Sequence, residues 1–257
     1  MLNGFKILIC GTSKITETHI KVIKNFKDCN IRYLFGSNNL RKDYLSKKFK
    51  IKICDNLNDQ NLKECNLAII TNSVKDHFST VELLSDKISN FIIEKSIVKN
   101  TLEFEKLKKL QNIHNLNIQE VSQYIYAPFI KENKNNRKNL KIIINKKRNL
   151  NYYKDYKGKI EFYKNPITSQ MPHWLDVAGY LTSSNLKILK IEKKKSDINM
   201  PFNDIFKIIL EDNSRLQILI DLNFACKINK TTEIIISDKL YKFGDTNISR
   251  KFKTYLN

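Results

Sequence analysis

Short apolar runs alternate with amphipathic stretches from residue 5 to about residue 120. Each run has the length of one buried strand, and the stretches between the runs repeat their apolar residues with the spacing of a helix. The predicted strands are 6–10, 31–35, 51–54, 67–71, 91–94 and 116–121. The predicted helices lie near 16–27, 40–49, 58–64, 76–86 and 101–112, the last with a capping box formed by Asn100 and Glu103. Strands that alternate with helices in this way predict a parallel, doubly wound α/β sheet.

The pattern changes after residue 120. Long polar stretches at 131–139 and 149–159 separate further strand-like runs, and one helix is predicted at 172–183, opening with Pro172. The predicted strands of this part are 140–145, 186–191, 203–210, 216–223 and 231–236. Many strands with few helices predict an α+β domain with a mostly antiparallel open sheet, one face of which carries the helix. We therefore expect two domains, 1–120 and 121–257.

The composition adds a strong positive charge, formally +20, to a chain whose 41% hydrophobic residues suffice for a core. Such a charge is typical of nucleic-acid binding, but here only six arginines accompany forty lysines, which are spread over nearly every segment. Specific contacts to phosphates and bases rely on the two-pronged guanidinium of arginine. We therefore expect no nucleic-acid partner, and instead an electrostatic preference for small anionic molecules.

The five cysteines are odd in number and include no C-x-x-C pair. This pattern favours free thiols in a reducing compartment and argues against a disulfide framework or a metal site. No apolar stretch approaches the roughly 18 residues that span a bilayer. The first residues lead directly into a predicted strand rather than into a secretory signal. A cytoplasmic protein without a membrane partner is expected.

The first predicted strand leads through Gly11 and a short polar turn into the first predicted helix. This is the outline of a strand–turn–helix that binds a dinucleotide, in which free N–H groups at the start of the helix contact the pyrophosphate. The usual pattern is G-x-G-x-x-G, whereas this chain has Gly11, Ser13 and Thr16 at the three positions. On this motif alone, a buried strand and a helix without a ligand remain an open alternative.

The end of the second predicted strand indicates which nicotinamide cofactor is bound. NAD enzymes place an acidic residue there for the ribose 2′-hydroxyl, while small polar and basic residues suit the 2′-phosphate of NADP. The segment 34–42 reads LFGSNNLRK and has no acid, so Ser37 and Arg41 are the candidates for contacting a phosphate. NADP is therefore preferred over NAD, although an ordinary turn before a lysine-rich helix explains the same residues.

Five segments, taken in order, match the motifs of one enzyme family. They are GTSKITETH at 11–19, TNSVKDH at 71–77, EKS at 94–96, YIYAP at 124–128 and HWLD at 173–176. The chain resembles the Gfo/Idh/MocA family of NAD(P)-dependent oxidoreductases, whose members have G-x-G-x-I-G-x-x-H, T-P/N-x-x-x-H, E-K-P, Y-R-F-N-P and H-x-x-D at these places; the second segment of this chain has one residue more before its histidine. A further segment, EIIISDKLY at 233–241, is similar to the family's E-I-I-G-S-x-G-T-L. The resemblance therefore covers nearly the whole chain.

This resemblance implies a Rossmann-like dinucleotide-binding domain, 1–120, followed by a domain, 121–257, for the substrate and for oligomerisation. It implies hydride transfer between nicotinamide and a hydroxyl or carbonyl carbon of a sugar, nucleotide-sugar or related small molecule, in surface-polysaccharide synthesis. Lys95 would orient the substrate hydroxyl, and His173 would accept its proton as the general base. In this family the open face of the second sheet joins subunits, so a homodimer or homotetramer is expected.

The expected site combines residues from both domains. His173, Asp176 and Tyr180 are spaced to share one face of the predicted helix, and Asp176, Tyr180 and Tyr124 are the expected substrate contacts. On spacing alone, a histidine such as His173 is more often a surface or capping residue than a catalytic one, and Trp174 is expected to be a packing anchor. The expected cofactor contacts, drawn from the matched segments and from 34–42, are Gly11, Thr12, Ser13, Lys14, Ile15, Ser37, Arg41, Thr71, Asn72, His77 and Glu94.

The chain also departs from the family at several points. Ser13 and Thr16 replace glycines and are expected to crowd a pyrophosphate. Ser96 replaces the proline of E-K-P, and Ser169 stands where many sugar dehydrogenases of the family have an aspartate. The chain is shorter than usual members, mainly between residues 130 and 170. These departures keep open a catalytically decayed Rossmann-fold binding or scaffold protein of the same descent, and a biliverdin-reductase-like or imine-reducing enzyme with a different proton donor.

Overall fold

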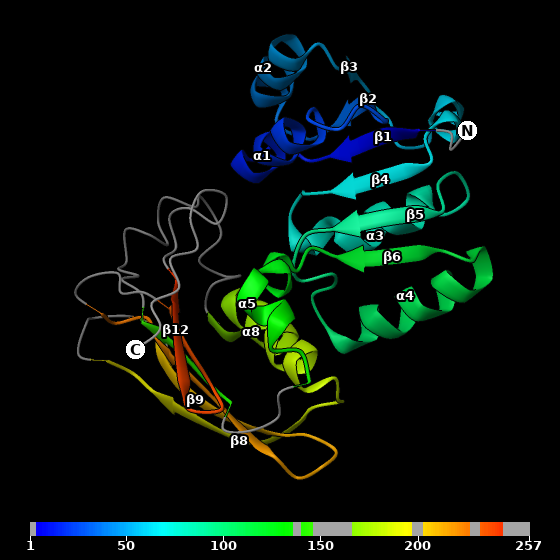
Figure 1. The fold of residues 1–257 in the computed structure, drawn as a ribbon. Helices are drawn as coiled ribbons and strands as arrows, with labels where there is room; N and C mark the ends of the chain where they lie inside the picture. Colours follow the sequence, from blue (N-terminus) through cyan, green and yellow to red (C-terminus); the bar gives the residue numbers. More distant parts are fainter. Residues whose placement is uncertain (1–3, 136–139, 146–165, 197–202, 227–231, 244–257) are drawn as a thin grey trace. The chain divides into compact units, whose positions relative to one another are not determined.

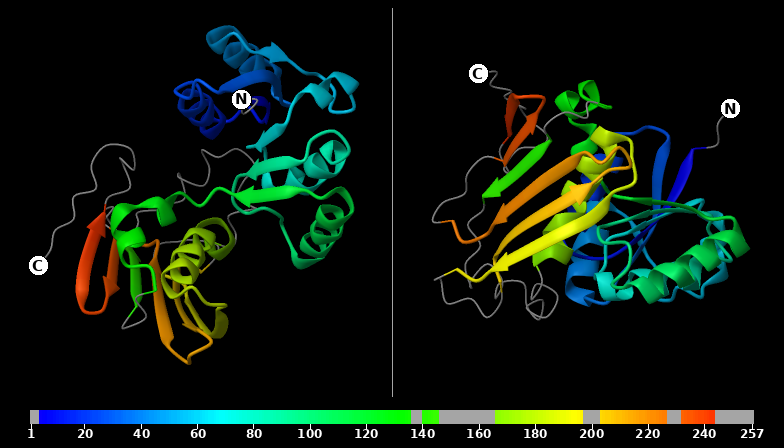
Figure 2. Two further views of the ribbon diagram at one scale, coloured as in Figure 1. Left: turned by 45° about the vertical axis from the view of Figure 1, so that its right-hand side comes forward. Right: turned by 90° about the horizontal axis from the view of Figure 1, so that it is seen from below.

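The structure of the chain, a computed structural model, describes residues 4–135, 140–145, 166–196, 203–226 and 232–243, with the backbone alone at 166–170 and 243. Contacts along the chain divide it into two compact units, Met1–Val121 and Ser122–Asn257. Each unit is described by itself (Figures 1 and 2). No helix within the described ranges is long and apolar enough to cross a membrane.

The first unit is built on a six-stranded parallel sheet with the strand order β3-β2-β1-β4-β5-β6. Its strands are β1 (Phe5–Cys10), β2 (Cys29–Phe35), β3 (Lys52–Ile53), β4 (Leu67–Ile70), β5 (Asn90–Ile93) and β6 (Asn117–Glu120). Its helices are α1 (Lys14–Ile23), α2 (Asn39–Phe49), α3 (Val74–Leu84), α4 (Thr101–His114) and the short 3-10 helix η1 (Gln60–Glu64). The chain runs outward from β1 to β3 and then outward from β4 to β6, so the strand order reverses between β1 and β4 (Figure 1). The predicted doubly wound sheet is confirmed.

Strand β1 supplies apolar side chains to a separate core on each face of this sheet. Ile7 and Ile9 belong to a cluster with residues of α1 and α2, whereas Leu8 and Cys10 belong to a second cluster with residues of α3 and α4. Successive side chains of a strand point to opposite faces, so the two helix pairs cover opposite faces of the sheet. Burial on both faces explains why the four residues from Ile7 to Cys10 form an unbroken apolar run in the sequence.

Polar caps set the starts of the helices. α1 begins at Lys14, directly after its N-cap Ser13, although the apolar spacing placed the start near residue 16. The predicted cap of α4 is present, because the Asn100 side chain accepts a hydrogen bond from the backbone N–H of Glu103. The segment expected to be helical at 58–64 forms only the short 3-10 helix η1.

The second unit contains a six-stranded sheet with the strand order β12-β11-β7-β10-β9-β8. The strands are β7 (Lys141–Asn145), β8 (Lys187–Lys194), β9 (Ile205–Glu211), β10 (Gln217–Asn223), β11 (Thr232–Ile236) and β12 (Lys239–Phe243). The helical segments are η2 (Gln123–Tyr126), α5 (Pro128–Glu132) and α8 (Pro166–Thr182). Only the β7–β10 pair is parallel among the five strand pairs of this sheet, so the sheet is mostly antiparallel, as the sequence predicts.

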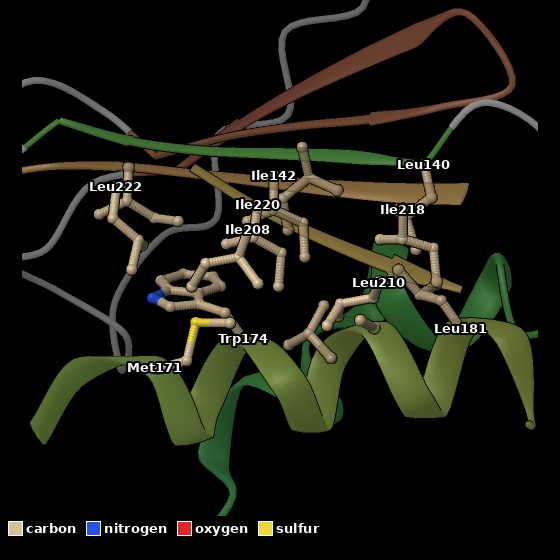
Figure 3. Packing of buried hydrophobic residues seen from close by; sticks show 14 of the residues in the cluster. Leu140, Ile142, Met171, Trp174, Leu181, Ile208, Leu210, Ile218, Ile220 and Leu222 are labelled. Carbon is tan, nitrogen blue, oxygen red and sulfur yellow. The ribbon is translucent and has the colours of Figure 1, made fainter. Parts of the chain in front are cut away.

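Helix α8 covers one face of this sheet (Figure 3). Met171, Trp174 and Leu181 point from the helix toward the strands, and Ile220 and Leu222 of β10 point back toward the helix. Residues three or four positions apart on a helix share one face, as do residues two apart on a strand. The apolar residues that repeat along α8 and along β10 therefore face each other and form one core.

The start of α8 differs from the prediction. The helix begins at Pro166, and Pro172, which was expected to open it, lies inside the helix. A proline suits the first position of a helix because its missing N–H would find no partner there. The prediction placed Pro172 at this first position, whereas Pro166 occupies it in the structure.

Strand β12 is absent from the sequence-based prediction. It pairs with β11 through the two-residue turn formed by Ser237 and Asp238, whose φ angles are 48° and 69°. Two positive φ angles are typical of the tight hairpin turn that most often contains Asn-Gly or Asp-Gly. A Ser-Asp pair gives that turn only a weak signal in the sequence.

Strand β8 forms one edge of the second sheet. All of its eight residues are exposed, four of them lysines. Ile188, Leu189 and Ile191 are 52%, 41% and 38% exposed, so this edge presents apolar side chains between basic ones.

Candidate functional site

The candidate residues of the first unit lie in loops at one edge of its sheet. Because the strands are parallel, the loops that follow β1, β2, β4 and β5 lie at the same, carboxyl, edge. The reversal of strand order between β1 and β4 opens a crevice at this edge in sheets of this type. The candidates in these loops and the helix starts behind them are Gly11, Thr12, Ser13, Lys14, Ile15, Ser37, Arg41, Thr71, Asn72, His77, Glu94 and Lys95.

Gly11 makes the turn after β1 possible. Its φ is +142°, and a Cβ at this position would lie 2.3 Å from the Thr71 hydroxyl, 2.7 Å from the Thr71 carbonyl carbon and 2.9 Å from the Asn72 nitrogen. The Gly11 N–H donates to the Phe35 carbonyl at 2.8 Å, and the Thr71 N–H donates to the Cys10 carbonyl at 2.7 Å. The first glycine of the motif is therefore required by the close approach of the loops after β1 and β4.

Thr16 stands at the third glycine position of the motif and faces the protein interior. Its side chain is fully buried, and its hydroxyl lies 2.8 Å from the Thr71 hydroxyl and accepts the Ser13 N–H at 3.0 Å. Thr71 in turn donates to the Cys10 carbonyl at 3.1 Å. The expectation that Thr16 crowds a pyrophosphate is therefore wrong, because this side chain joins α1 to the loop after β4 and does not point toward solvent.

The start of α1 is open to an anion. Ser13, Lys14 and Ile15 are exposed, and the first N–H groups of a helix carry partial positive charge. Lys14 adds a full charge beside them. This arrangement fits the pyrophosphate of a dinucleotide, although the Ser13 N–H itself is used by Thr16.

The loop after β2 carries the two residues expected to contact a 2′-phosphate. Ser37 is exposed, and the Asn38 side chain caps α2 by accepting the Arg41 N–H at 3.0 Å. The Arg41 guanidinium donates to the carboxylate of Glu17 on α1, and it lies over the Tyr44 ring, 4.7 Å from its centroid. In this structure, therefore, Arg41 is held by a carboxylate and Ser37 is open.

Glu17 is the centre of this charged cluster. Its carboxylate accepts hydrogen bonds from Lys48, at 2.9 Å, and from Arg41, and Lys21 lies 3.3 Å away. The hydrogen bond from Lys48, supported by Arg41 and Lys21 against the effect of burial, lowers the pKa of Glu17 to about 2. Three cations around one carboxylate leave a net positive charge beside the loop after β2.

The loop after β5 carries Glu94 and Lys95, and two histidines contact it. His19 of α1 places its Nε2 atom 2.7 Å from the Glu94 carboxylate. His77 of α3 is fully buried and places Nδ1 2.9 Å from the carbonyl oxygen of Ser96. The peptide bond between Lys95 and Ser96 is cis. Lys95 thus lies between two residues that are each bound by a histidine.

His77 also contacts the loop after β4. Its Nε2 atom lies 3.3 Å from the carbonyl oxygen of Asn72. The Asn72 side chain donates to the Thr80 hydroxyl at 2.9 Å, while its carbonyl oxygen Oδ1 is buried without a hydrogen-bond partner in the described part of the chain. One imidazole therefore joins the loops that follow β4 and β5.

The remaining candidates lie in the second unit, at helix α8 and the turn η2. The Tyr124 ring stacks on Trp174, with centroids 4.8 Å apart, and meets the His173 ring edge-on at the same distance. His173 is 5% exposed, while Asp176 and Tyr180 are half-buried on the same helix. Trp174 is a packing anchor, and Tyr124 lies against His173 rather than standing free. Ser169 lies in the part of α8 where only the backbone is described.

In the described part of the chain, no cluster of three His, Cys, Asp or Glu side chains could hold a metal ion. The edge described above offers instead a glycine turn, an open helix start and a charged loop. Residues 5–120 match the sequence profile of the Gfo/Idh/MocA oxidoreductases, a family with an NAD-binding Rossmann fold. The Rossmann unit belongs to this family. We find no curated protein whose sequence matches the chain.

Solved structures extend the likeness in fold beyond the Gfo/Idh/MocA unit to the whole chain. A putative NADPH-dependent oxidoreductase from Desulfitobacterium hafniense DCB-2 has a TM-score of 0.80 at 11% identity, over 100% of this chain and 83% of that one. The UDP-N-acetylglucosamine 3-dehydrogenase GnnA from Acidithiobacillus ferrooxidans has a TM-score of 0.77 at 13% identity, over 95% of this chain and 78% of that one. The WlbA dehydrogenase from Chromobacterium violaceum, in complex with NADH and UDP-GlcNAcA, has a TM-score of 0.79 at 10% identity, over 98% of this chain and 78% of that one. At these identities the likeness establishes the fold.

Sequence reasoning missed part of the candidate site in the Gfo/Idh/MocA unit. Glu17 has no motif of its own, and only the packing of α1 against α2 brings it to Arg41. Thr16 was considered only as a replacement for the third glycine of the motif, although its hydroxyl contacts the Thr71 hydroxyl. His19 matched the family motif, but its contact with Glu94 joins residues 75 positions apart and leaves no local signal.

Acidification is expected to weaken the Gfo/Idh/MocA unit through His77. Burial, the largest effect, lowers the pKa of His77 below its ordinary value of 6.5, while the carbonyls of Ser96 and Asn72 and the charge of Glu94 oppose this. Below pH 6.5 the unfolded chain therefore binds a proton that the folded chain does not. The free energy of unfolding should fall by up to about 1.4 kcal/mol per pH unit from this group.

Urea unfolding of the wild type and of His77→Asn, followed by circular dichroism at pH 7.5, 6.5 and 5.5, measures this effect. Subtracting the free energy of unfolding of the variant from that of the wild type at each pH cancels the contributions of the other titrating groups. We expect the wild type to lose stability relative to the variant on acidification. A relative gain would mean that a protonated His77, donating to both carbonyls, is the stable folded form.

Proposed function

We propose that the chain is an NAD(P)-dependent oxidoreductase that transfers a hydride between nicotinamide and a hydroxyl or carbonyl carbon of a sugar, nucleotide-sugar or related small molecule. The observation that carries the proposal is the edge of the Rossmann unit. There Gly11 and the open start of α1 follow β1, and the loop with Lys95 follows β5, on the other side of β4, in a sheet whose sequence matches NAD-binding oxidoreductases. Surface-polysaccharide synthesis is the pathway class that this proposal favours.

Different residues of the first unit would bind different parts of the cofactor. Thr12, Ser13, Lys14 and Ile15 hold the pyrophosphate at the start of α1, and the loop after β2 receives the adenosine ribose. The loops after β4 and β5 border the nicotinamide. When bound, the nicotinamide supplies the hydride chemistry.

The residues around the substrate provide orientation and proton transfer. Lys95 donates a hydrogen bond to the substrate oxygen and thereby favours loss of its proton. His173 accepts that proton, since histidine is the side chain that most often serves as a general base. Tyr124 supports the His173 ring from the side. Asp176 and Tyr180, on the same helix, contact the substrate.

A nucleotide-sugar is the first substrate class to test. One structure with the same fold is named as a UDP-N-acetylglucosamine 3-dehydrogenase, and another is a dehydrogenase in complex with UDP-GlcNAcA. The net positive charge of the chain is compatible with an anionic substrate. A catalytically decayed scaffold protein is the second candidate, and the serine at position 13 in place of a glycine is the observation that favours it.

The test measures the melting temperature with NAD(H) and with NADP(H), and then cofactor fluorescence. A cofactor at 100 times its dissociation constant adds about 2.7 kcal/mol to the free energy of unfolding. Trp174 is the only tryptophan of the chain, and its emission overlaps the absorption of reduced nicotinamide. We expect a rise in melting temperature and energy transfer from Trp174 to the bound reduced cofactor. Neither signal with any dinucleotide would favour the scaffold protein.

Arg41→Ala is expected to weaken NADPH binding about tenfold and NADH binding less than twofold. The 2′-phosphate would compete with Glu17 for the guanidinium, and only NADPH gains from this contact. Arg32→Ala is the matched control, because Arg32 pairs with Glu64 instead. Titration of Trp174 emission gives the dissociation constants of the wild type and of both variants for NADPH and for NADH. Equal losses for both cofactors in Arg41→Ala would contradict the preference for NADP.

We also propose that copies of the chain associate through the face of the second sheet opposite α8. Ile143, Ile209, Leu219 and Ile235 alternate with the core residues of their strands and are only half-buried. Apolar side chains on an otherwise open face are typical of an interface between subunits. Sedimentation velocity should show one species with the mass of two or four chains. A monomer at micromolar concentration would contradict this assembly.

A further inference from the structure

We propose that His19 and His77 are positioning residues for Lys95, which hold the loop after β5 from its two sides. The inference rests on the proposed function, because the position of Lys95 matters only where a nicotinamide binds beside it. The two histidines have no part in the chemistry itself.

The first contact fixes the residue after Lys95. His77 lies in α3, is fully buried, and has its Nδ1 atom 2.9 Å from the Ser96 carbonyl oxygen. This is the shorter of its two contacts, the other being 3.3 Å to Asn72, and it assigns the proton to Nδ1. The N–H of His77 therefore donates to the backbone directly after Lys95.

The second contact fixes the residue before Lys95. His19 lies in α1, and its Nε2 atom is 2.7 Å from a carboxylate oxygen of Glu94. The two side chains are 20% and 15% exposed, so water competes little for this hydrogen bond. The start of the same helix is the proposed pyrophosphate site. His19 thus ties the loop of Lys95 to the helix that would hold the cofactor.

The contacts of His77 exceed what packing alone requires. A leucine would fill much of the same space without removing two ring nitrogens from water, which costs free energy unless they are hydrogen-bonded. The Nδ1–H group donates to the Ser96 carbonyl, so one buried hydrogen bond attaches the loop after β5 to α3. Together the two histidines fix the backbone on both sides of Lys95, from which its side chain extends.

The charge of Lys95 offers a readout of its position. The oxidised nicotinamide ring is positively charged and the reduced ring is neutral, so a nearby ammonium disfavours the oxidised cofactor relative to the reduced one. The ratio of the dissociation constants for NADP⁺ and NADPH therefore reports how close Lys95 is. Loss of stability alone changes both constants together and leaves the ratio as it was.

The experiment uses matched amide substitutions in the full chain, with binding followed by calorimetry. An asparagine amide nitrogen reaches the place of Nδ1 in a histidine, and a glutamine amide nitrogen reaches the place of Nε2. His77→Asn therefore keeps the donor to Ser96 and His77→Gln loses it. At the other position, His19→Gln keeps the donor to Glu94 and His19→Asn loses it. Lys95→Met removes the charge itself.

We expect the wild type to bind NADPH about tenfold more tightly than NADP⁺. His77→Gln, His19→Asn and Lys95→Met should reduce this ratio to about twofold, and His77→Asn and His19→Gln should keep it. Affinity for 2′,5′-ADP, which lacks nicotinamide, should stay within twofold in all variants. In the Lys95→Met background, adding His77→Gln should change the ratio no further, because residues that act through one group are not additive.

The proposal would be overturned if Lys95→Met lowered the ratio while His77→Gln and His19→Asn kept the wild-type value. It would also fail if the two amides at one position gave the same ratio. These outcomes leave the proposed function intact, since the wild type would still bind both cofactors. A wild type that binds no dinucleotide at all would instead refute the proposed function, and this inference with it.

Discussion

His173→Ala is expected to lower turnover by about 10² to 10⁴, with the affinity for NADPH nearly unchanged. In the proposed mechanism, removal of the imidazole leaves the substrate hydroxyl without an acceptor for its proton, while the proposed cofactor contacts of the first unit are unaltered. His173 is 5% exposed and meets the Tyr124 ring edge-on, so its ring is held in one orientation. Turnover is measured with the substrate found in a screen of sugars and nucleotide-sugars.

His114→Ala is the matched control for this substitution. His114 ends α4 in the first unit, is exposed, and should change turnover by less than twofold. Circular dichroism confirms that both variants are folded. A His173→Ala protein with the wild-type rate would remove His173 from the mechanism and favour the imine-reducing alternative, in which another group supplies the proton.

Gly11→Ala is expected to destabilise the first unit by about 2 to 6 kcal/mol, combining a strained backbone with overpacking. The φ of +142° is unfavourable for any side chain, and the new Cβ would meet backbone atoms of Thr71 and Asn72 within 3 Å. Backbone atoms in two hydrogen-bonded loops cannot move aside as the end of a side chain can. Unfolding by urea, followed by circular dichroism, measures the loss.

Gly179→Ala is the control for a glycine without such contacts. A Cβ there would meet only Leu186 Cδ1, at 4.0 Å, and an alanine inside a helix is favoured over glycine by roughly 0.5 to 1 kcal/mol. This variant should be as stable as the wild type or slightly more stable. Equal stability of Gly11→Ala and the wild type would mean that the turn after β1 is far looser than the structure shows.

The layers of the fold could be predicted because they follow from local patterns. The run from Ile7 to Cys10 is apolar at every position because both faces of β1 are buried. The helix boundaries were less predictable. At Pro166 and Pro172 the same rule fits two positions, and only the packing of α8 on the sheet distinguishes them. The hairpin that ends in β12 was missed because Ser237 and Asp238 are uncommon residues for its turn.

The site could be predicted only where a motif marks it. The segments around Gly11, Thr71 and Glu94 were located because each follows a strand and matches a family pattern. The state of each side chain was not predictable, since it depends on residues distant in sequence. Thr16 was expected to point outward and is buried against Thr71, and Arg41 was expected to be available and is paired with Glu17.

The exposed edge of the second sheet bears on how the protein behaves at high concentration. A strand with free N–H and C=O groups can pair with the same strand of another molecule and start aggregation. In β8 the lysines at both ends and at Lys190 separate the apolar Ile188, Leu189 and Ile191. Two such edges would bring like charges together, which opposes their pairing. Solubility of the chain should therefore depend on these lysines, and high salt or acetylation would remove that protection.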